Sequence, residues 1–237
     1  MTLIDRKMLF RAAGIAAILV LAIFPLQLSV FALAWPPPET AQAYFDLLHS
    51  NPVVGLLSLD VLLMVDWLIL LVVWAGLYKA LRPHAPRMVR VAMILVVAAT
   101  VMYFISNTAF QMLSLSQQYA SPATQAQRDV LLAAGASALA TFDGPWFTVS
   151  YIMSGIAVAL VSMVMWRAPA FGKLVGGIGI AYGALQIVPP NFGTIGMIVS
   201  LVSLVPMLAW LALVAWKLLR LARADAAHPR RRANATT

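Results

Sequence analysis

Six long apolar segments constrain the fold of this 237-residue chain more than any other feature of its sequence. A helix needs about 20 mainly apolar residues to cross the hydrocarbon core of a membrane, where its backbone polar groups must be satisfied within the helix. The segments that meet this requirement are Ala12–Trp35, Val53–Tyr78, Val89–Gln111, Gly144–Trp166, Leu174–Pro189 and Thr194–Trp216. They predict an all-α, polytopic membrane protein built as a bundle of six transmembrane helices.

Charged residues are too scarce to cover a soluble surface of this size. They make up 10% of the chain, and hydrophobic residues make up 62%, whereas an ordinary soluble domain carries about 25% charged residues. The lack of cysteine excludes thiolate nucleophiles and iron–sulfur ligation. The three histidines, His49, His84 and His228, fall in predicted loops or the tail, so no metal site, haem or other cofactor is expected.

Lysine and arginine indicate how the bundle is oriented. All but Arg128 fall in four segments: before the first predicted span, after the second, after the fourth and after the sixth. Basic residues concentrate on the cytoplasmic side of membrane proteins, so both termini are predicted to be cytoplasmic. A basic ring at one membrane face is expected to meet anionic lipid headgroups rather than nucleic acid.

The N-terminus leaves one alternative topology open. Arg6, Lys7 and Arg11, followed by an apolar run and then Ala32-Leu33-Ala34, resemble a cleavable signal peptide. The apolar run is about 20 residues long, whereas the corresponding region of a signal peptide has about 7–15. A membrane-anchored first helix is therefore the favoured interpretation.

Two amphipathic segments are predicted outside the membrane, on the side opposite the basic ring. The first is a short helix around Tyr44, Phe45, Leu47 and Leu48. The second covers 123–139, with Ser121 as its expected N-cap and apolar residues at helical spacing, namely Ala126, Val130, Leu131, Ala134 and Ala138. We expect the second helix to cover the mouth of the bundle, and a mobile lid or a partner-docking surface is the alternative. The whole bundle is predicted to be one domain, 1–223, followed by a disordered basic tail, 224–237.

The outer segment also carries a family resemblance. The stretches LSLSQQYA, residues 113–120, and AQRDVLLAAG, residues 126–135, precede the fourth predicted span. Together with the order of spans over residues 90 to 220, they resemble a family of bacterial six-span membrane proteins of unknown function. The resemblance implies a six-helix protein of the bacterial inner membrane, and it carries over no catalytic or binding residue.

Two aspartates in the second predicted span give the main clue to function. Asp60 and Asp66 are about 10 Å and 20 Å along that span from its outer end, and about 120° of rotation separates them. An aspartate at the centre of a spanning helix costs roughly 2.5–3.5 kcal/mol, and the one basic residue inside a predicted span, Arg90, is at the cytoplasmic start of Val89–Gln111. We therefore expect both to point into the bundle, toward neutral polar residues of its outer half. The predicted ligand-binding residues are Asp60, Asp66, Asn107, Gln111, Tyr151 and Gln186.

Three functions are compatible with these acids. The favoured one is binding or transport of a small cation or an amphiphilic molecule through an outward-facing acidic zone. The second is a non-catalytic structural or regulatory role, in which protonated aspartates hydrogen-bond across helices. An enzyme is disfavoured, because no nucleophile with an evident base accompanies the acids.

Glycines in the fifth predicted span suggest how that span packs. Gly179 and Gly183 have the spacing that lets two membrane helices approach closely. Packing inside the bundle is the expected use, and homodimerisation is the alternative.

Overall fold

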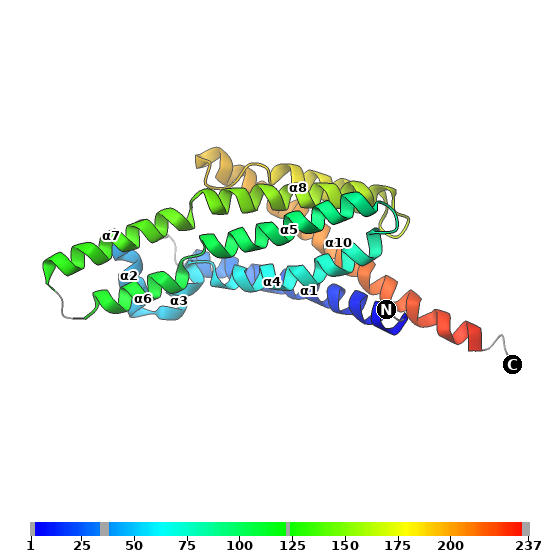
Figure 1. Ribbon diagram of the computed structural model, residues 1–237, viewed down its shortest axis with the longest axis horizontal. Helices are drawn as coiled ribbons and strands as arrows, with labels where there is room; N and C mark the ends of the chain where they lie inside the picture. The colour runs from blue at the N-terminus through cyan, green and yellow to red at the C-terminus, as the bar shows by residue number, and fades with distance from the viewer. Residues whose placement is uncertain (1–2, 34–37, 122–123, 234–237) are drawn as a thin grey trace. The chain divides into compact units, whose positions relative to one another are not determined.

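The computed structural model describes residues 3–33, 38–121 and 124–233, and every regular element in them is a helix (Figure 1). This confirms the predicted all-α class. In chain order the helices are α1 (Leu3–Leu33), α2 (Ala41–Ser50), α3 (Pro52–Ser58), α4 (Val61–Leu81), α5 (Pro86–Ser106), α6 (Ala109–Tyr119), α7 (Gln125–Phe142), α8 (Pro145–Arg167), α9 (Gly172–Leu185) and α10 (Gly193–Ala233).

Five helical stretches are long and apolar enough to cross a membrane. They are Asp5–Val30, Val61–Leu81, Pro86–Tyr119, Gln125–Arg167 and Gly193–Ala224. Large apolar side chains such as Leu68, Ile94 and Val205 are more than half exposed on them, which suits a lipid environment. The fifth predicted span corresponds to α9, whose 14 residues extend about 21 Å. The long helices are those of a multi-pass membrane protein.

The predicted single domain 1–223 is divided in the structure into two compact units. Unit 1 comprises 1–22, 67–99 and 151–237, and unit 2 comprises 23–66 and 100–150. Each has its own apolar core, because the buried residues form two separate clusters. Phe10, Leu77 and Leu218 are fully buried in unit 1, and Phe45 and Leu48 lie at the centre of the core of unit 2.

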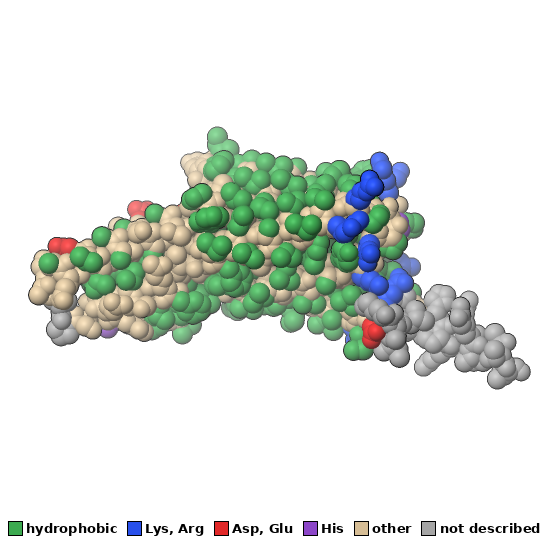
Figure 2. All heavy atoms as spheres, in the orientation of Figure 1, with side chains coloured by type: hydrophobic (Ala, Val, Ile, Leu, Met, Phe, Trp, Pro, Cys, Tyr) green, Lys and Arg blue, Asp and Glu red, His purple; other side chains and the backbone are tan. Residues whose placement is uncertain are grey.

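Unit 1 places nearly all of the basic charge at one of its ends. The lysine and arginine side chains visible in Figure 2 form a band there, beside a broad hydrophobic surface. Glycine brings α8 and α9 together, as predicted for Gly179 and Gly183. A Cβ atom on Gly183 would lie 2.7 Å from the backbone nitrogen of Ala159, and one on Gly179 would lie 2.1 Å from Oγ of Ser162.

A tight turn connects α9 to α10. The backbone N–H of Phe192 donates to the carbonyl of Pro189 at 3.2 Å. Gly193 follows with a φ of +65°, a left-handed conformation that costs glycine little because it has no Cβ. Helix α9 has already ended at Leu185, and Gly193 allows the backbone to start α10.

Unit 2 contains four short helices that pack on one another, namely α2, α3, α6 and α7 (Figure 1). The predicted helix around Tyr44 is α2, and it buries Tyr44, Phe45 and Leu48. Asn51 ends α2 and starts α3: its N–H donates to the Leu47 carbonyl, and its Oδ1 accepts from the N–H of Val54 at 3.1 Å. The two helices are therefore joined without a loop.

The structure corrects the predicted start and face of α7. Thr124 caps this helix in place of Ser121, through a capping box in which the Thr124 and Gln127 side chains each accept a backbone N–H of the other. The expected apolar face is only partly buried, because Ala138 is buried but Val130 is 68% exposed.

Two further expectations differ from the structure. The predicted span Val53–Tyr78 is interrupted between α3 and α4, and Asp60 lies in the interruption. Residues 224–233, expected to be disordered, continue α10 as helix, consistent with the high helix propensity of their alanines and arginines. The last four residues of the predicted tail, 234–237, lie outside the described residues.

Candidate functional site

Three helix interruptions carry the polar side chains of unit 2. Leu59 and Asp60 separate α3 from α4, Asn107 and Thr108 separate α5 from α6, and Asp143 and Gly144 separate α7 from α8. An interrupted helix leaves backbone groups without their usual partners. In membrane transporters such interruptions often form the binding site for a solute or a coupling ion.

Asp60 adopts a backbone conformation that is unusual for a residue with a side chain. Its φ is +60°, in the left-handed region, where aspartate and asparagine are the least disfavoured residues other than glycine. Its Oδ1 accepts a hydrogen bond from Nε2 of Gln27 at 3.3 Å, and the same amide nitrogen donates to the Leu57 carbonyl at 3.2 Å. Gln27 of α1 thus links the carboxyl group of the interruption to the end of α3.

Asn107 joins two of the interruptions. Its Nδ2 donates to the carbonyl of Leu59 at 2.9 Å, and its Oδ1 accepts from the backbone N–H of Ala109 at 3.1 Å. Leu59 and Ala109 are fully buried, so one side chain satisfies a buried acceptor at the α3–α4 interruption and a buried donor at the start of α6. Thr108 adds a third link by donating to the Ala138 carbonyl of α7 at 3.0 Å.

The charges around Asp60 are negative. Burial, and then the nearby Asp143 carboxylate, raise the pKa of Asp60 to about 7. The pKa of Tyr44 on α2 is raised to about 12 by burial, by Asp143 and by Asp60, in that order. Unit 2 contains six of the eight acidic residues of the chain and a single arginine, Arg128, whose guanidinium lies 5.9 Å from the centre of the Tyr119 ring.

Two buried oxygens near this cluster accept no hydrogen bond from the described residues. Oε1 of Gln27 and Oδ1 of Asp66 have no partner, and the two residues are 1% and 3% exposed. Asp66 lies on α4, six residues after Asp60, and both carboxyl groups are within electrostatic reach of the Tyr103 phenol. Buried acceptors are almost always paired, so these oxygens are suited to a ligand or a proton that supplies a donor.

The six predicted site residues fall into two groups. Asp60, Asp66 and Asn107 belong to unit 2, with Asp60 and Asn107 at neighbouring interruptions. Gln111 also belongs to unit 2, but its side chain on α6 is exposed.

The other two predicted site residues belong to unit 1. The Tyr151 hydroxyl is hydrogen-bonded to Oγ of Ser200 at 3.2 Å. Gln186, directly after α9, is buried, and its Oε1 has no partner among the described residues. These contacts belong to the α8, α9 and α10 packing of unit 1.

Sequence reasoning did not assign Gln27, Tyr44 or Asp143 to the site. Gln27 had a readable signal, because it is a polar residue within an apolar span and so needs a partner inside the protein. Tyr44 and Asp143 are connected to Asp60 only by the fold of unit 2, and the sequence contains no local sign of that proximity.

Carboxylate, amide and carbonyl oxygens gather at the interruptions, but the described residues contain no group of three or more His, Cys, Asp or Glu side chains able to hold a metal ion. A proton, an alkali cation or a protonated amine matches acceptors that carry one or two negative charges.

Comparison with family models, with curated proteins and with solved structures finds no significant match to this chain.

Proposed function

We propose that this protein binds a small cation or a cationic amphiphile at the interruptions of unit 2 and passes it into or across the membrane. The observation that carries the proposal is that two buried acceptors of unit 2, Gln27 Oε1 and Asp66 Oδ1, accept no hydrogen bond from the described residues, while the Gln27 amide also bonds to Asp60. A cation with N–H groups, or with a partly removed hydration shell, supplies what these oxygens lack. The excess of acidic over basic residues in unit 2 favours the entry of a cation.

The proposal includes a topology with six traverses and both termini in the cytoplasm of a bacterial cell. The basic band of unit 1 supports this orientation. Pro169 and Ala170, just before α9, line the same hollow as Lys217 and Arg220 of α10. Because α10 is long enough to cross the membrane and returns the chain to this end, α9 and the turn after it make the opposite crossing.

Two helical stretches contain more residues than one membrane crossing needs. The stretch that contains α5 and α6 has 34 residues, and the one that contains α7 and α8 has 43. A crossing of a hydrocarbon core of about 30 Å takes about 20 residues. In the proposed topology each stretch therefore has residues left over for a segment outside the hydrocarbon core.

A structural role is the competing function, and one contact favours it. Oδ1 of Asp60 already accepts a hydrogen bond from Gln27, and a carboxyl group with a pKa of about 7 is half protonated at neutral pH. In this alternative the aspartates hold the interrupted helices together, and no solute binds.

Thermal stability of the purified protein separates the two functions. Wild type, Asp66→Asn and Asp60→Asn are compared with and without sodium, potassium and a series of alkylammonium ions. Asp129→Asn is the matched control, because Asp129 is an exposed acid of α7 that bonds only to Gln125 within its own helix.

Binding predicts a selective effect of one cation. A cation at about 100 times its Kd stabilises the folded state by about 2.7 kcal/mol, and this gain should disappear in Asp66→Asn while Asp129→Asn keeps it. Without the cation, Asp66→Asn should be more stable than wild type, because a buried negative charge has been removed. If no cation raises the melting temperature and both asparagine variants are neutral or destabilised, the aspartates are structural and the binding function is wrong.

A further inference from the structure

Unit 1 contains a groove within its basic band. A cavity of about 380 Å³ lies between the start of α5, the end of α8 and the middle of α9. This volume falls within the range of about 300–1,000 Å³ typical of small-molecule sites. His84 and Arg167 supply its polar groups, and Met88, Met163, Trp166 and Ile180 supply most of its apolar wall.

The polar side of the groove is suited to bind an anion. Arg167 is exposed, and its guanidinium has no hydrogen-bond or ion-pair partner in the described part of the chain. None of the described residues lining the groove is acidic. Helix α5 starts at Pro86, beside the groove, and the partial positive charge of a helix N-terminus adds to that of Arg167. A guanidinium matches a phosphate through two parallel hydrogen bonds.

The apolar side of the groove identifies which kind of anion fits. Met88, Met163 and Trp166 are exposed along it, next to a cationic group. The Trp166 ring lies against α9, because a Cβ atom on Gly177 would be 3.1 Å from that ring. A dissolved phosphate would leave this apolar surface uncovered. A phospholipid has a phosphate next to its acyl chains, just as the groove has an arginine next to its apolar wall.

We infer that this groove binds one anionic phospholipid, with its phosphate on Arg167 and His84 and the upper part of its acyl chains along Met88, Met163 and Ile180. The site lies at the basic face of unit 1, where anionic headgroups are attracted. It does not depend on the acidic residues of unit 2, so it stands whether or not those residues bind a cation.

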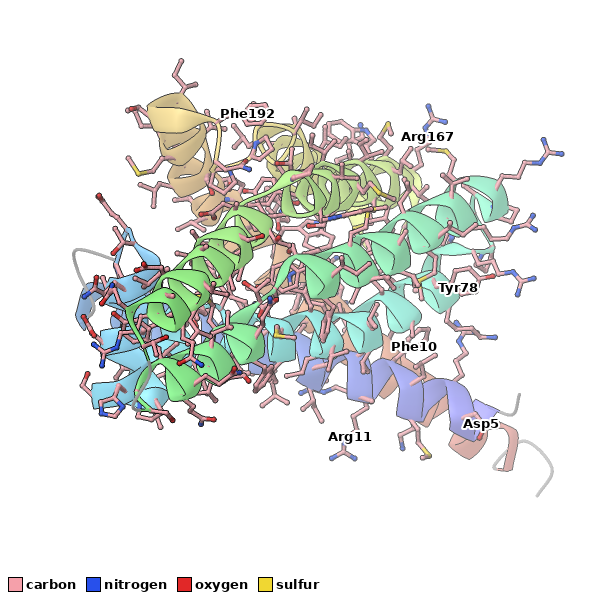
Figure 3. The ribbon with its side chains drawn as sticks, turned by 60° about the vertical axis from the view of Figure 1, so that its left-hand side comes forward. Asp5, Phe10, Arg11, Tyr78, Arg167 and Phe192 are labelled. Carbon is pink, nitrogen blue, oxygen red and sulfur yellow. The ribbon has the colours of Figure 1, made fainter. Side chains whose placement is uncertain are left out.

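Native mass spectrometry of the full chain tests this directly. The protein is purified in a mild detergent and mixed with phosphatidylglycerol, phosphatidylcholine or glycerol phosphate. Arg167→Gln removes the cationic group, and Met88→Trp fills the groove from an exposed position without changing charge. Arg11→Gln is the control: Figure 3 shows Arg11 and Arg167 extending from α1 and α8 on opposite sides of the view, and Arg11 is also exposed.

The expected result is retention of one phosphatidylglycerol molecule in preference to phosphatidylcholine, and no retention of glycerol phosphate. Arg167→Gln should weaken phosphatidylglycerol binding about fivefold, Met88→Trp should weaken it similarly, and Arg11→Gln should leave it unchanged. Equal losses in Arg167→Gln and Arg11→Gln would overturn the site in favour of diffuse attraction to the whole band. Equal retention of the two lipids, or binding of glycerol phosphate alone, would overturn it too.

Discussion

Replacing Asn107 by leucine tests whether one side chain holds two helix interruptions together. The substitution keeps the number and branching of the side-chain heavy atoms but removes the donor to the Leu59 carbonyl and the acceptor of the Ala109 N–H. Both of these residues are fully buried, so water cannot easily replace the lost partner. An orphaned buried polar group costs about 1–3 kcal/mol, and the two together should lower the free energy of unfolding by about 2–4 kcal/mol.

The loss should be visible in a thermal melt followed by helical circular dichroism in detergent. For a chain of this size, each kcal/mol shifts the melting temperature by roughly 2–4 °C, so a decrease of about 5–15 °C is expected. Hydrogen exchange of the Ala109 amide should accelerate in the variant. Gln118→Ala is the control, because the Gln118 side chain is exposed and bonds only to Ser114 of its own helix. If Asn107→Leu melts within about 1 °C of wild type, the reasoning that couples the interruptions through this side chain is refuted.

Substitutions at three further positions test the structure. The pKa of Asp60 is about 7 in the folded state, against an ordinary value of 3.8, so the free energy of unfolding should fall by up to about 4 kcal/mol as the pH rises from 4 to 7. In Asp60→Asn, denaturation midpoints measured across this pH range should change less with pH than in wild type. An unchanged pH dependence in the variant would contradict the assigned burial. Gly183→Leu should cost about 3 kcal/mol or more, because its Cβ would lie 2.7 Å from the backbone of α8, and a change below about 0.5 kcal/mol in a denaturant titration would exclude the close packing of α8 and α9. Gly193→Ala should cost about 1–2 kcal/mol through its φ of +65° alone, since no atom lies within 4 Å of the added Cβ, and Gly193→Asn should cost less in the same titration.

The sequence predicts those features that rest on length, hydropathy and single-residue conformational preference. Apolar runs predicted the long helices, and Gly183 packs closely on α8 as its spacing with Gly179 predicted. The capping box of α7 was also readable, because threonine followed three residues later by glutamine at Thr124 and Gln127 is its usual pattern.

The interruption at Asp60 is less visible in the sequence, for a physical reason. The flanking residues from Val53 to Leu70 are apolar enough to form one continuous helix, so hydropathy alone predicts no interruption. What stabilises the left-handed conformation of Asp60 is tertiary, namely the amide of Gln27 on α1 and the amide of Asn107 after α5. Contacts between residues more than 30 positions apart leave no periodic signal in one sequence. The acids of the polar cluster could therefore be predicted from the sequence, but the contacts that bring its residues together could not.

The uneven division of charge also limits how two copies of this chain could associate. Fifteen of the sixteen lysines and arginines belong to unit 1, so in the proposed topology every copy would insert in the same direction. A symmetric pair must then have its two-fold axis along the membrane normal, which sets the two basic ends side by side in the same leaflet. Such a pair would be held apart by its own charge unless anionic lipid lay between the subunits, and its assembly would respond to lipid composition and ionic strength before it responded to any solute.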